Sequence, residues 1–305
     1  MIKYLNEKEK SLTKSLYKEA FFEDSDRFID YYYSEKLKDN RILADIDDDV
    51  IKSMLMLNPY RISVLGKKYG LYYIVAVATG KRYRRQGCMR RLLNKALVDM
   101  NNLNLPFTYL IPANKDYYLP FDFAFVAGKN EYNISLSKFG FKKTVIKDKE
   151  LSDNEIKRIL NFINSEVSKS NDVYTYRDLE YFKREMKEIV SENGFINIYS
   201  DKENIVAYES FWGEKQELKE RIVSEEFSAR ECKKENIMAR ITDIKKLLSD
   251  FRSNSPIDII IKINDRIIEA QNNYFRIRMN DKSCDIKTVQ ESEAKYGFVE
   301  FDIGD

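Results

Sequence analysis

Apolar residues recur at helical spacing most clearly between residues 89 and 100. A stripe at i, i+3, i+4, i+7 and i+8 predicts an amphipathic helix. The run Ile74–Thr79 before it consists mainly of β-branched and small apolar residues, which predicts a buried strand. Phe107–Ile111 predicts the next strand, so this stretch is expected to form a strand–turn–helix–strand (βαβ) unit. The helical stripe consists of Met89, Leu92, Leu93, Ala96, Leu97 and Met100.

Weaker patterns complete an α/β unit over residues 1–140. Helical spacing over residues 12–20 predicts one helix, and Ser25 is placed to cap a second one. Arg41–Asp45 and Ser53–Leu57 predict two strands on either side of an acidic turn.

Residues 141–234 are rich in charge and carry no chemical motif. Helical spacing predicts helices at Leu151–Ser168 and Tyr176–Ser191. A hairpin is expected with strands at Phe195–Tyr199 and Ile205–Tyr208. The single tryptophan of the chain, Trp212, is interpreted as a packing residue.

Residues 235–305 predict a small α+β module. Ile237–Ile241 is expected to be its first strand, and Thr242 is expected to cap a short helix. Further strands are predicted at Ile257–Ile263, Tyr274–Met279 and Phe298–Phe301. The chain as a whole is therefore expected to be an α/β (α+β) protein of three units, 1–140, 141–234 and 235–305.

The composition excludes several kinds of catalytic and binding site. The chain has 305 residues with 52 Lys+Arg and 50 Asp+Glu, so its net charge is +2 and no basic footprint for nucleic acid is present. The absence of histidine excludes a Ser-His-Asp triad, a Cys-His dyad and His-ligated zinc, and no metal is expected. Three cysteines without a CxxC motif suggest a reducing compartment. Since no membrane span or signal peptide is recognised, we expect a cytoplasmic protein that does not bind membranes.

The turn between the predicted strand Ile74–Thr79 and the helix that follows it carries the candidate chemistry. Unpaired amides and the positive end of the helix dipole favour an anion such as pyrophosphate at a helix start. Arg82, Arg84 and Arg85 can add charge-assisted hydrogen bonds, and Gly87 lets the backbone approach a ligand. The alternative for such a segment taken alone is an ordinary solvated basic turn.

Arg84-Arg85-Gln86-Gly87-Cys88-Met89 resembles the R/Q-x-x-G-x-G/A signature of the GCN5-related N-acetyltransferase (GNAT) superfamily, with Met89 in place of Gly or Ala. Tyr118-Leu119-Pro120-Phe121-Asp122-Phe123 is similar to an element of the enhanced-intracellular-survival (Eis) branch. So are Leu57-Asn58-Pro59-Tyr60 and Ile237-Met238-Ala239-Arg240-Ile241, the latter opening a sterol-carrier-protein-like C-terminal domain. The resemblance implies a GNAT domain, a reduced second GNAT-like domain and that C-terminal module.

The resemblance also implies roles. Tyr118 would be the general acid, and the terminal carboxylate of Asp305 or a water relay would be the base. The backbone of Val77, Ala78 and Thr79 would bind the pantetheine arm and polarise the thioester. The pyrophosphate of acetyl-CoA would be held by Arg82, Arg84, Arg85, Gln86, Gly87, Cys88 and Met89. Phe22, Asp24 and Asp26 would border the acceptor amine, and the alternative for this segment is a solvated helix start with one apolar face.

The expected function is acetyl-CoA-dependent N-acetylation of a primary amine on a small molecule or peptide. An aminoglycoside, a polyamine and a lysine are all compatible with the sequence. The alternatives are a GNAT relative that binds CoA without catalysis, or a lipid-binding module. Eis-like relatives form trimers or hexamers, so the resemblance implies a homo-oligomer of one of these kinds.

Overall fold

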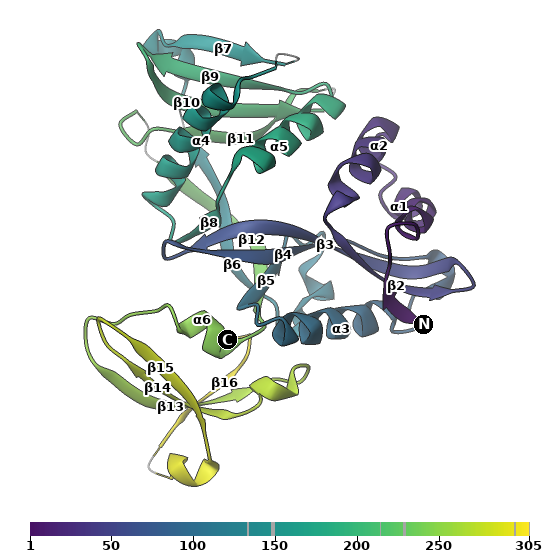
Figure 1. The fold of residues 1–305 in the computed structure, drawn as a ribbon, viewed down its shortest axis with the longest axis vertical. Coiled ribbons are helices and arrows are strands. Elements are labelled where there is room, and N and C mark those ends of the chain that lie inside the picture. The colour runs from purple at the N-terminus through teal and green to yellow at the C-terminus, as the bar shows by residue number, and fades with distance from the viewer. Residues whose placement is uncertain (133, 148–149, 214, 228–229, 296, 305) are drawn as a thin grey trace.

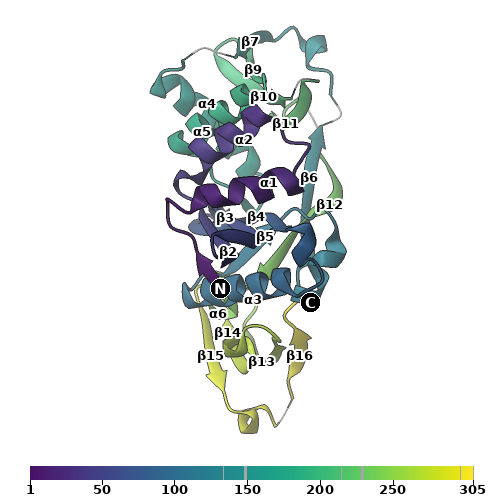
Figure 2. The same cartoon turned by 90° about the vertical axis from the view of Figure 1, so that its right-hand side faces the viewer.

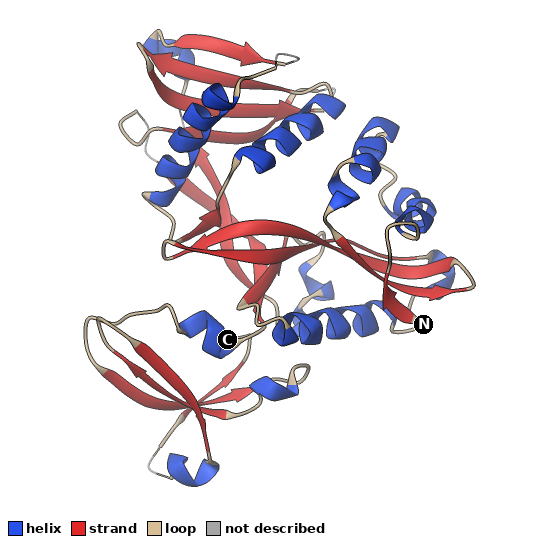
Figure 3. Cartoon of the chain, in the orientation of Figure 1, coloured by secondary structure: helices blue, strands red, loops and turns tan. Residues whose placement is uncertain are grey.

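The computed structural model describes residues 1–305 except 133, 148–149, 214, 228–229, 296 and 305. Three sheets follow one another along the long axis of the molecule (Figure 1). The largest sheet lies in the middle, and the other two lie at the two ends with their own helices (Figure 3). Among the helices in the described part of the chain, none is long and apolar enough to cross a membrane.

The middle sheet has the order β1-β2-β3-β4-β5-β12-β6, and β8 pairs with β3 beside this path. Its strands are antiparallel except for the pair β4 and β5, which is parallel. The parallel pair joined by a helix confirms the predicted βαβ unit. The strands are β1 (Ile2–Tyr4), β2 (Arg41–Asp47), β3 (Val50–Val64), β4 (Lys67–Thr79), β5 (Phe107–Leu110), β6 (Ala124–Tyr132), β8 (Val173–Thr175) and β12 (Arg230–Ile241).

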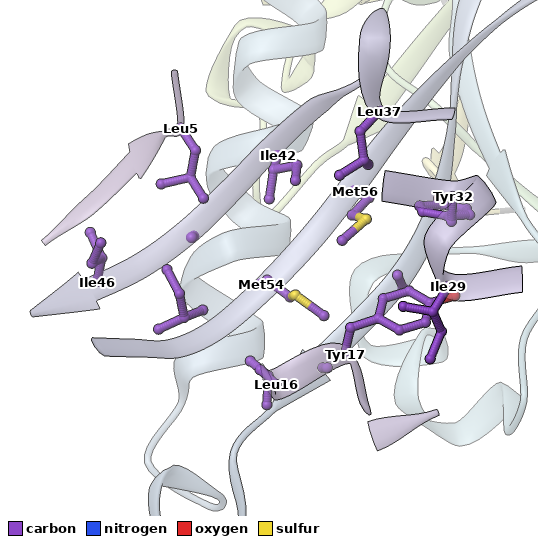
Figure 4. Close-up of a cluster of buried hydrophobic side chains, with 14 of the residues drawn as sticks. Leu5, Leu16, Tyr17, Ile29, Tyr32, Leu37, Ile42, Ile46, Met54 and Met56 are labelled. Atoms are coloured by element: carbon purple, nitrogen blue, oxygen red, sulfur yellow. The ribbon is translucent and has the colours of Figure 1, made fainter. Parts of the chain in front are cut away.

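Helices cover both faces of the middle sheet (Figure 2). On one face, α1 (Lys14–Ala20) and α2 (Asp26–Ser34) bury an apolar cluster against β2 and β3 (Figure 4). The Oγ of Ser25 accepts a hydrogen bond from Phe28 N, which confirms the predicted cap. On the other face, α3 (Cys88–Asn102) buries its predicted stripe, in which Leu92 and Leu97 are fully enclosed.

The second sheet has the order β11-β10-β9-β7 and is antiparallel throughout. A capping box of Ser152 and Glu155 starts α4. The helix predicted from residue 176 begins later, because residues 173–175 form β8 and Asp178 caps α5. The elements are β7 (Lys142–Ile146), α4 (Asp153–Ser168), α5 (Leu179–Ser191), β9 (Phe195–Asp201), β10 (Asn204–Trp212) and β11 (Glu217–Val223).

Aromatic contacts, hydrogen bonds and ion pairs join this unit to the first helices. Trp212 meets Phe28 of α2 edge to face, with ring centroids 5.2 Å apart, so its packing role is confirmed. Arg184 of α5 is paired with Asp39, which lies after α2, at 2.8 Å. Helix α5 therefore lies beside α2, as Figure 1 shows.

The third sheet has the order β15-β14-β13-β16, with β13 and β16 parallel. Its elements are α6 (Ile244–Leu248), β13 (Ile257–Asn264), β14 (Tyr274–Met279), β15 (Cys284–Val289) and β16 (Val299–Asp302). The expectation that Thr242 caps α6 is wrong. Asp243 is the cap and accepts from Lys246 N, whereas the hydroxyl of Thr242 donates to Leu105 O.

The expected first strand of the C-terminal module belongs elsewhere. Residues 237–241 are the end of β12, which is bonded to β5 on one side and to β6 on the other. Met238 is fully buried in the core between the middle sheet and α3. The apolar side chains at the end of β12 complete the core of the middle sheet. The helices and strands of the C-terminal module therefore begin after Ile241.

Candidate functional site

Strands β4 and β5 diverge at the centre of the middle sheet. Within the described residues they form one bridge, between Tyr73 and Tyr109. Beyond Tyr73, β4 runs on to Thr79 with β3 as its partner on one edge only. Parallel strands that separate in this way leave backbone N–H and C=O groups of β4 available for a ligand. The edge includes Val77, Ala78 and Thr79, the residues expected to contact the pantetheine arm.

A bulge distorts β4 at this edge. The register with β3 shifts between Met54 and Met56, and Ala76 has a φ of +51°. A left-handed conformation is costly for a residue with a Cβ, and such outliers concentrate at functional sites. Bulges also turn the backbone groups of a strand away from the regular ladder. The strain lies one residue before Val77, so the structure singles out the same stretch of strand as the sequence.

The turn after β4 leads directly into α3. Gly87 is the N-cap residue, with a φ of +73° and no side chain to cap the helix. The first amides of α3 therefore have no capping side chain and can bind an anion together with the helix dipole. Cys88 is buried, and Met89 packs its side chain into the core under α3 instead of across the turn. Methionine in place of the usual Gly or Ala is thus accommodated.

The basic side chains of the turn are available to solvent. Arg82, Arg84 and Arg85 are exposed and form no ion pair with any residue that the structure describes. Arg84 donates through Nε to Thr79 O at 3.3 Å, and Gln86 donates to Arg82 O at 3.0 Å, so the turn is partly held by its own residues. Three exposed guanidinium groups around free amides can bind a doubly charged phosphate group.

Arg91 holds this turn from the first turn of α3, a role that the sequence analysis missed. It donates to Gln86 O at 2.8 Å and to the carboxylate of Asp45 at 2.9 Å. The sequence offered one signal for this role. Arg91 lies four residues after Gly87, on the outer side of the predicted helix. The turn is therefore connected to β2 as well as to α3.

Tyr118 lies in the loop between β5 and β6, at the junction of two short 3₁₀ turns. Its side chain packs in the same apolar core as Val77, Met89 and Leu93, and it meets Phe123 edge to face at 5.9 Å. Burial raises the pKa of Tyr118 to about 12. The phenol is therefore protonated at neutral pH and can act as a proton donor.

A buried arginine fixes this loop. Arg240 of β12 is 1% exposed, and it donates to Phe121 O at 3.0 Å and to the carboxylate of Asp265 at 2.8 Å. Asp265 in turn accepts from the amides of Ile267 and Ile268 in the C-terminal unit. The segment Ile237–Ile241 was noted in the sequence only as part of a resemblance. The sequence of this segment did not indicate that Arg240 would be buried beside Asp265.

The residues expected at the acceptor site lie in the connection between α1 and α2 and at the first position of α2. Phe22 is 79% exposed. Asp24 accepts a hydrogen bond from the phenol of Tyr17 at 2.8 Å, and burial raises the pKa of this carboxyl. Asp26 accepts from Lys18 at 2.6 Å, which lowers its pKa. Both carboxylates thus have partners within the first unit.

The last described residues return to the Tyr118 loop. Gly304 packs so closely against Asp122 that an added Cβ would lie 3.2 Å from Asp122 O. Asp305, the expected base, lies outside the described residues. No group of three potential metal ligands is found in the described part of the chain.

Comparisons with known proteins agree with this geometry. Residues 1–126 match the model of the acetyltransferase (GNAT) domain. No curated protein matches the chain. The fold is similar to that of a conserved protein of unknown function from Enterococcus faecalis V583, a probable N-acyltransferase. The two are 14% identical, with a TM-score of 0.79 over 99% of this chain and 87% of the other.

Two further structures share the fold. A GCN5-related N-acetyltransferase from Anabaena variabilis ATCC 29413 has a TM-score of 0.75 and 13% identity, over 100% of this chain and 88% of the other. Eis1 from Mycobacterium abscessus has a TM-score of 0.68 and 9% identity, over 100% of this chain and 87% of that one. The expected mixed α/β architecture is thereby confirmed.

Proposed function

We propose that this GNAT-type N-acetyltransferase moves the acetyl group of acetyl-CoA directly to a primary amine of the aminoglycoside, polyamine or lysine type. One observation carries the proposal. Val77 on the open edge of β4, Met89 at the start of α3 and the buried phenol of Tyr118 pack in one cluster. A thioester site, an anion site and a proton donor would thus border the same apolar core.

Acetyl-CoA would bind along this region. The backbone of Val77–Thr79 would hold the pantetheine arm and polarise the thioester carbonyl, since fixed backbone donors need little reorganisation as charge develops. The pyrophosphate would lie against the amides of Gly87, Cys88 and Met89, with Arg82, Arg84, Arg85 and Gln86 around it.

The chemistry requires two proton movements. An alkyl ammonium with a pKa of about 10.4 is neutral in roughly one molecule in 2,500 at pH 7, so a base must first remove a proton. The amine nitrogen then bonds to the carbonyl carbon, the carbon–sulfur bond breaks, and Tyr118 donates its proton to the leaving thiolate. The base is the carboxylate of Asp305 or a water relay, and the packing of Gly304 against Asp122 supports the first of these.

Three further features stay proposals. Phe22, Asp24 and Asp26 would border the acceptor, because carboxylates and aromatic faces attract cations. The C-terminal unit would be a sterol-carrier-protein-like scaffold. The protein would assemble into homo-trimers or hexamers, which light scattering on the purified protein would detect.

Thiol release from acetyl-CoA in the presence of spermidine, kanamycin or a lysine peptide tests the activity. Tyr118→Phe should lower kcat by about 100-fold, since general acids contribute roughly 10²–10⁴-fold, and should leave the KM for acetyl-CoA unchanged. Tyr117→Phe is the matched control, because Tyr117 is 58% exposed in the same loop. Equal rates for the two variants would reject Tyr118 as the acid, and no transfer to any amine would reject the activity.

A second candidate function, binding of an apolar ligand, has one observation in its favour. A cavity of about 450 Å³ is lined by apolar side chains of β5, β6, β8 and β12, including Phe107, Ala124 and Ala239. Displacement of a fluorescent fatty acid, and its loss in Ala239→Phe, would demonstrate such binding.

A further inference from the structure

A separate cavity of about 440 Å³, lined mostly by charged residues and tyrosines, lies between the first and second units. Its walls come from the segment after α2, from the hairpin of β3 and β4, and from α5 and β11. It therefore exists only because α5 lies against the middle sheet. Its size is in the range of small-molecule sites. The residues that carry the argument are Tyr60, Gly70, Tyr181, Glu185, Glu188 and Lys219.

Most of the buried or half-buried charges that line this cavity are paired. Burial alone would raise the pKa of Glu188, but Lys219 and Lys36 together hold it below its usual value. Such pairs leave little net charge for a ligand. The pairs are Lys219–Glu188 at 2.7 Å, Lys36–Glu188 at 3.6 Å, Arg184–Asp39 at 2.8 Å and Arg61–Asp178 at 3.0 Å.

Glu185 is the exception. It is 7% exposed, lines the cavity, and its Oε2 has no hydrogen-bond partner among the described residues. Burial raises its pKa, and Arg177 and Lys219 oppose this only in part. The guanidinium of Arg177 binds Glu220 at 2.6 Å and makes no ion pair with Glu185. A buried carboxylate oxygen without a partner costs stability, and a cationic ligand that reached Oε2 of Glu185 would supply the missing partner.

Tyrosine rings complete the cavity. The rings of Tyr60 and Tyr181 are 6.0 Å apart, and the ammonium of Lys36 already lies 5.0 Å from the Tyr60 ring. Aromatic faces attract alkylammonium groups. Tyr60 also meets Tyr73 at 6.1 Å, and Tyr73 forms the bridge between β4 and β5 where the two strands separate. The cavity is thus joined through adjacent rings to the open edge of β4.

We propose that this cavity binds an ammonium group of the acceptor, with Glu185 as its counter-ion. The inference rests on the proposed function and narrows it to amines that carry a second positive charge, such as polyamines. One nitrogen would react near Tyr118 while another is held at Glu185. A carboxylate oxygen without a hydrogen-bond partner, beside aromatic rings, favours a cation over an anion.

Calorimetric titration of spermidine into the full-length protein, without acetyl-CoA, tests the site apart from catalysis. Glu185→Gln keeps the shape and removes the charge, and it should weaken spermidine binding about tenfold or more. Glu217→Gln is the control, because Glu217 is an exposed carboxylate on β11 outside the cavity. Unchanged affinity in Glu185→Gln, or no binding of spermidine to the unaltered protein, would overturn the proposal.

A second variant keeps the test independent of Glu185. Gly70 lines the cavity with open space around it, so Gly70→Val narrows the cavity without touching the carboxyl. It should also weaken spermidine binding, and unchanged affinity would again count against the site. In steady-state assays Glu185→Gln should raise the KM for spermidine and leave the KM for acetyl-CoA unchanged. Spermidine binding lost in Glu185→Gln together with no transfer by the unaltered protein would reject the proposed function but support the site.

Discussion

The middle sheet and the second sheet differ in how completely their strands are paired. In the middle sheet, β4 and β5 share one described bridge and then separate, and β4 carries a strained Ala76 beside the gap. In the second sheet, β11, β10, β9 and β7 are antiparallel neighbours along their lengths. The comparison shows that an incomplete parallel pair, followed by a helix start, leaves backbone groups open at the place where we propose that the cofactor binds. The paired strands of the second sheet leave no such gap between them. The second unit contributes instead through α5, which lines the cavity that contains Glu185.

The largest expected effect comes from removing the arginine that holds the middle sheet to the Tyr118 loop. Arg240→Met should lower the free energy of unfolding by about 3–5 kcal/mol, because Asp265 would stay buried without its cation. Urea denaturation measures this. The double variant Arg240→Met/Asp265→Leu should recover part of the loss, since the fully buried carboxylate of Asp265 is removed together with its cation. A loss below about 1 kcal/mol in the single variant would contradict the assigned role.

Damage confined to the second sheet should spare acetyl-CoA binding. In Gly194→Ala the new Cβ would lie 2.1 Å from Phe211 O and 2.8 Å from Ile189 O. We expect a loss of about 1–3 kcal/mol from this overpacking, seen as faster proteolysis of the second unit. Gly213→Ala, which meets no atom within 4 Å, is the milder control. If acetyl-CoA affinity fell as much as stability, the two sheets would not be separable in function.

The turn before α3 offers a smaller and more specific change. Gly87→Ala places a Cβ at a φ of +73°, which should cost about 1 kcal/mol and raise the KM for acetyl-CoA several-fold. Gly66→Ala introduces the same kind of strain at φ +82° in the β3–β4 turn. It should leave that KM unchanged. Equal KM values in the two variants would argue that the turn does not bind the pyrophosphate.

The smallest expected effect is on the pH profile. A general acid must be protonated, and the pKa of Tyr118 is raised to about 12 by burial. Activity that depends on this proton should therefore be retained as pH rises past 10 and be lost only as pH approaches 12. The check is kcat measured from pH 7 to 10.5. A falling limb centred below pH 10 would mean that another group, with a lower pKa, is the acid.

Local patterns predicted the elements that form the proposed cofactor site. The stripe on α3, the buried run before it and the cap at Ser25 are each set by residues within a few positions of one another, and all three were found. The hairpin of β9 and β10 was predicted for the same reason. Short strands such as β1, β8 and β15 were not predicted, since their pairing depends on distant partners and not on their own alternation.

Long-range pairing explains the rest of the errors. Ile237–Ile241 has the composition of a strand, but nothing local indicates that it lies between β5 and β6. Arg240 has no visible role until Asp265 and Phe121 O come within hydrogen-bond distance. Glu185 is one acidic residue among many on a charged helix, and its burial depends on how α5 packs beside β11 and the β3–β4 hairpin.

The position of β12 also has a consequence for synthesis on the ribosome. The matched domain ends at residue 126, yet the strand that joins β5 to β6 is complete only at Ile241, 241 − 126 = 115 residues later. Translation proceeds at about 5–20 residues per second, so β12 is synthesised roughly 6–23 s after the matched domain. During this time β5 and β6 have no strand between them. The edges of β5 and β6 are open to wrong partners during this interval. Chaperone dependence of the newly made protein should therefore be set by the time needed to translate the second unit.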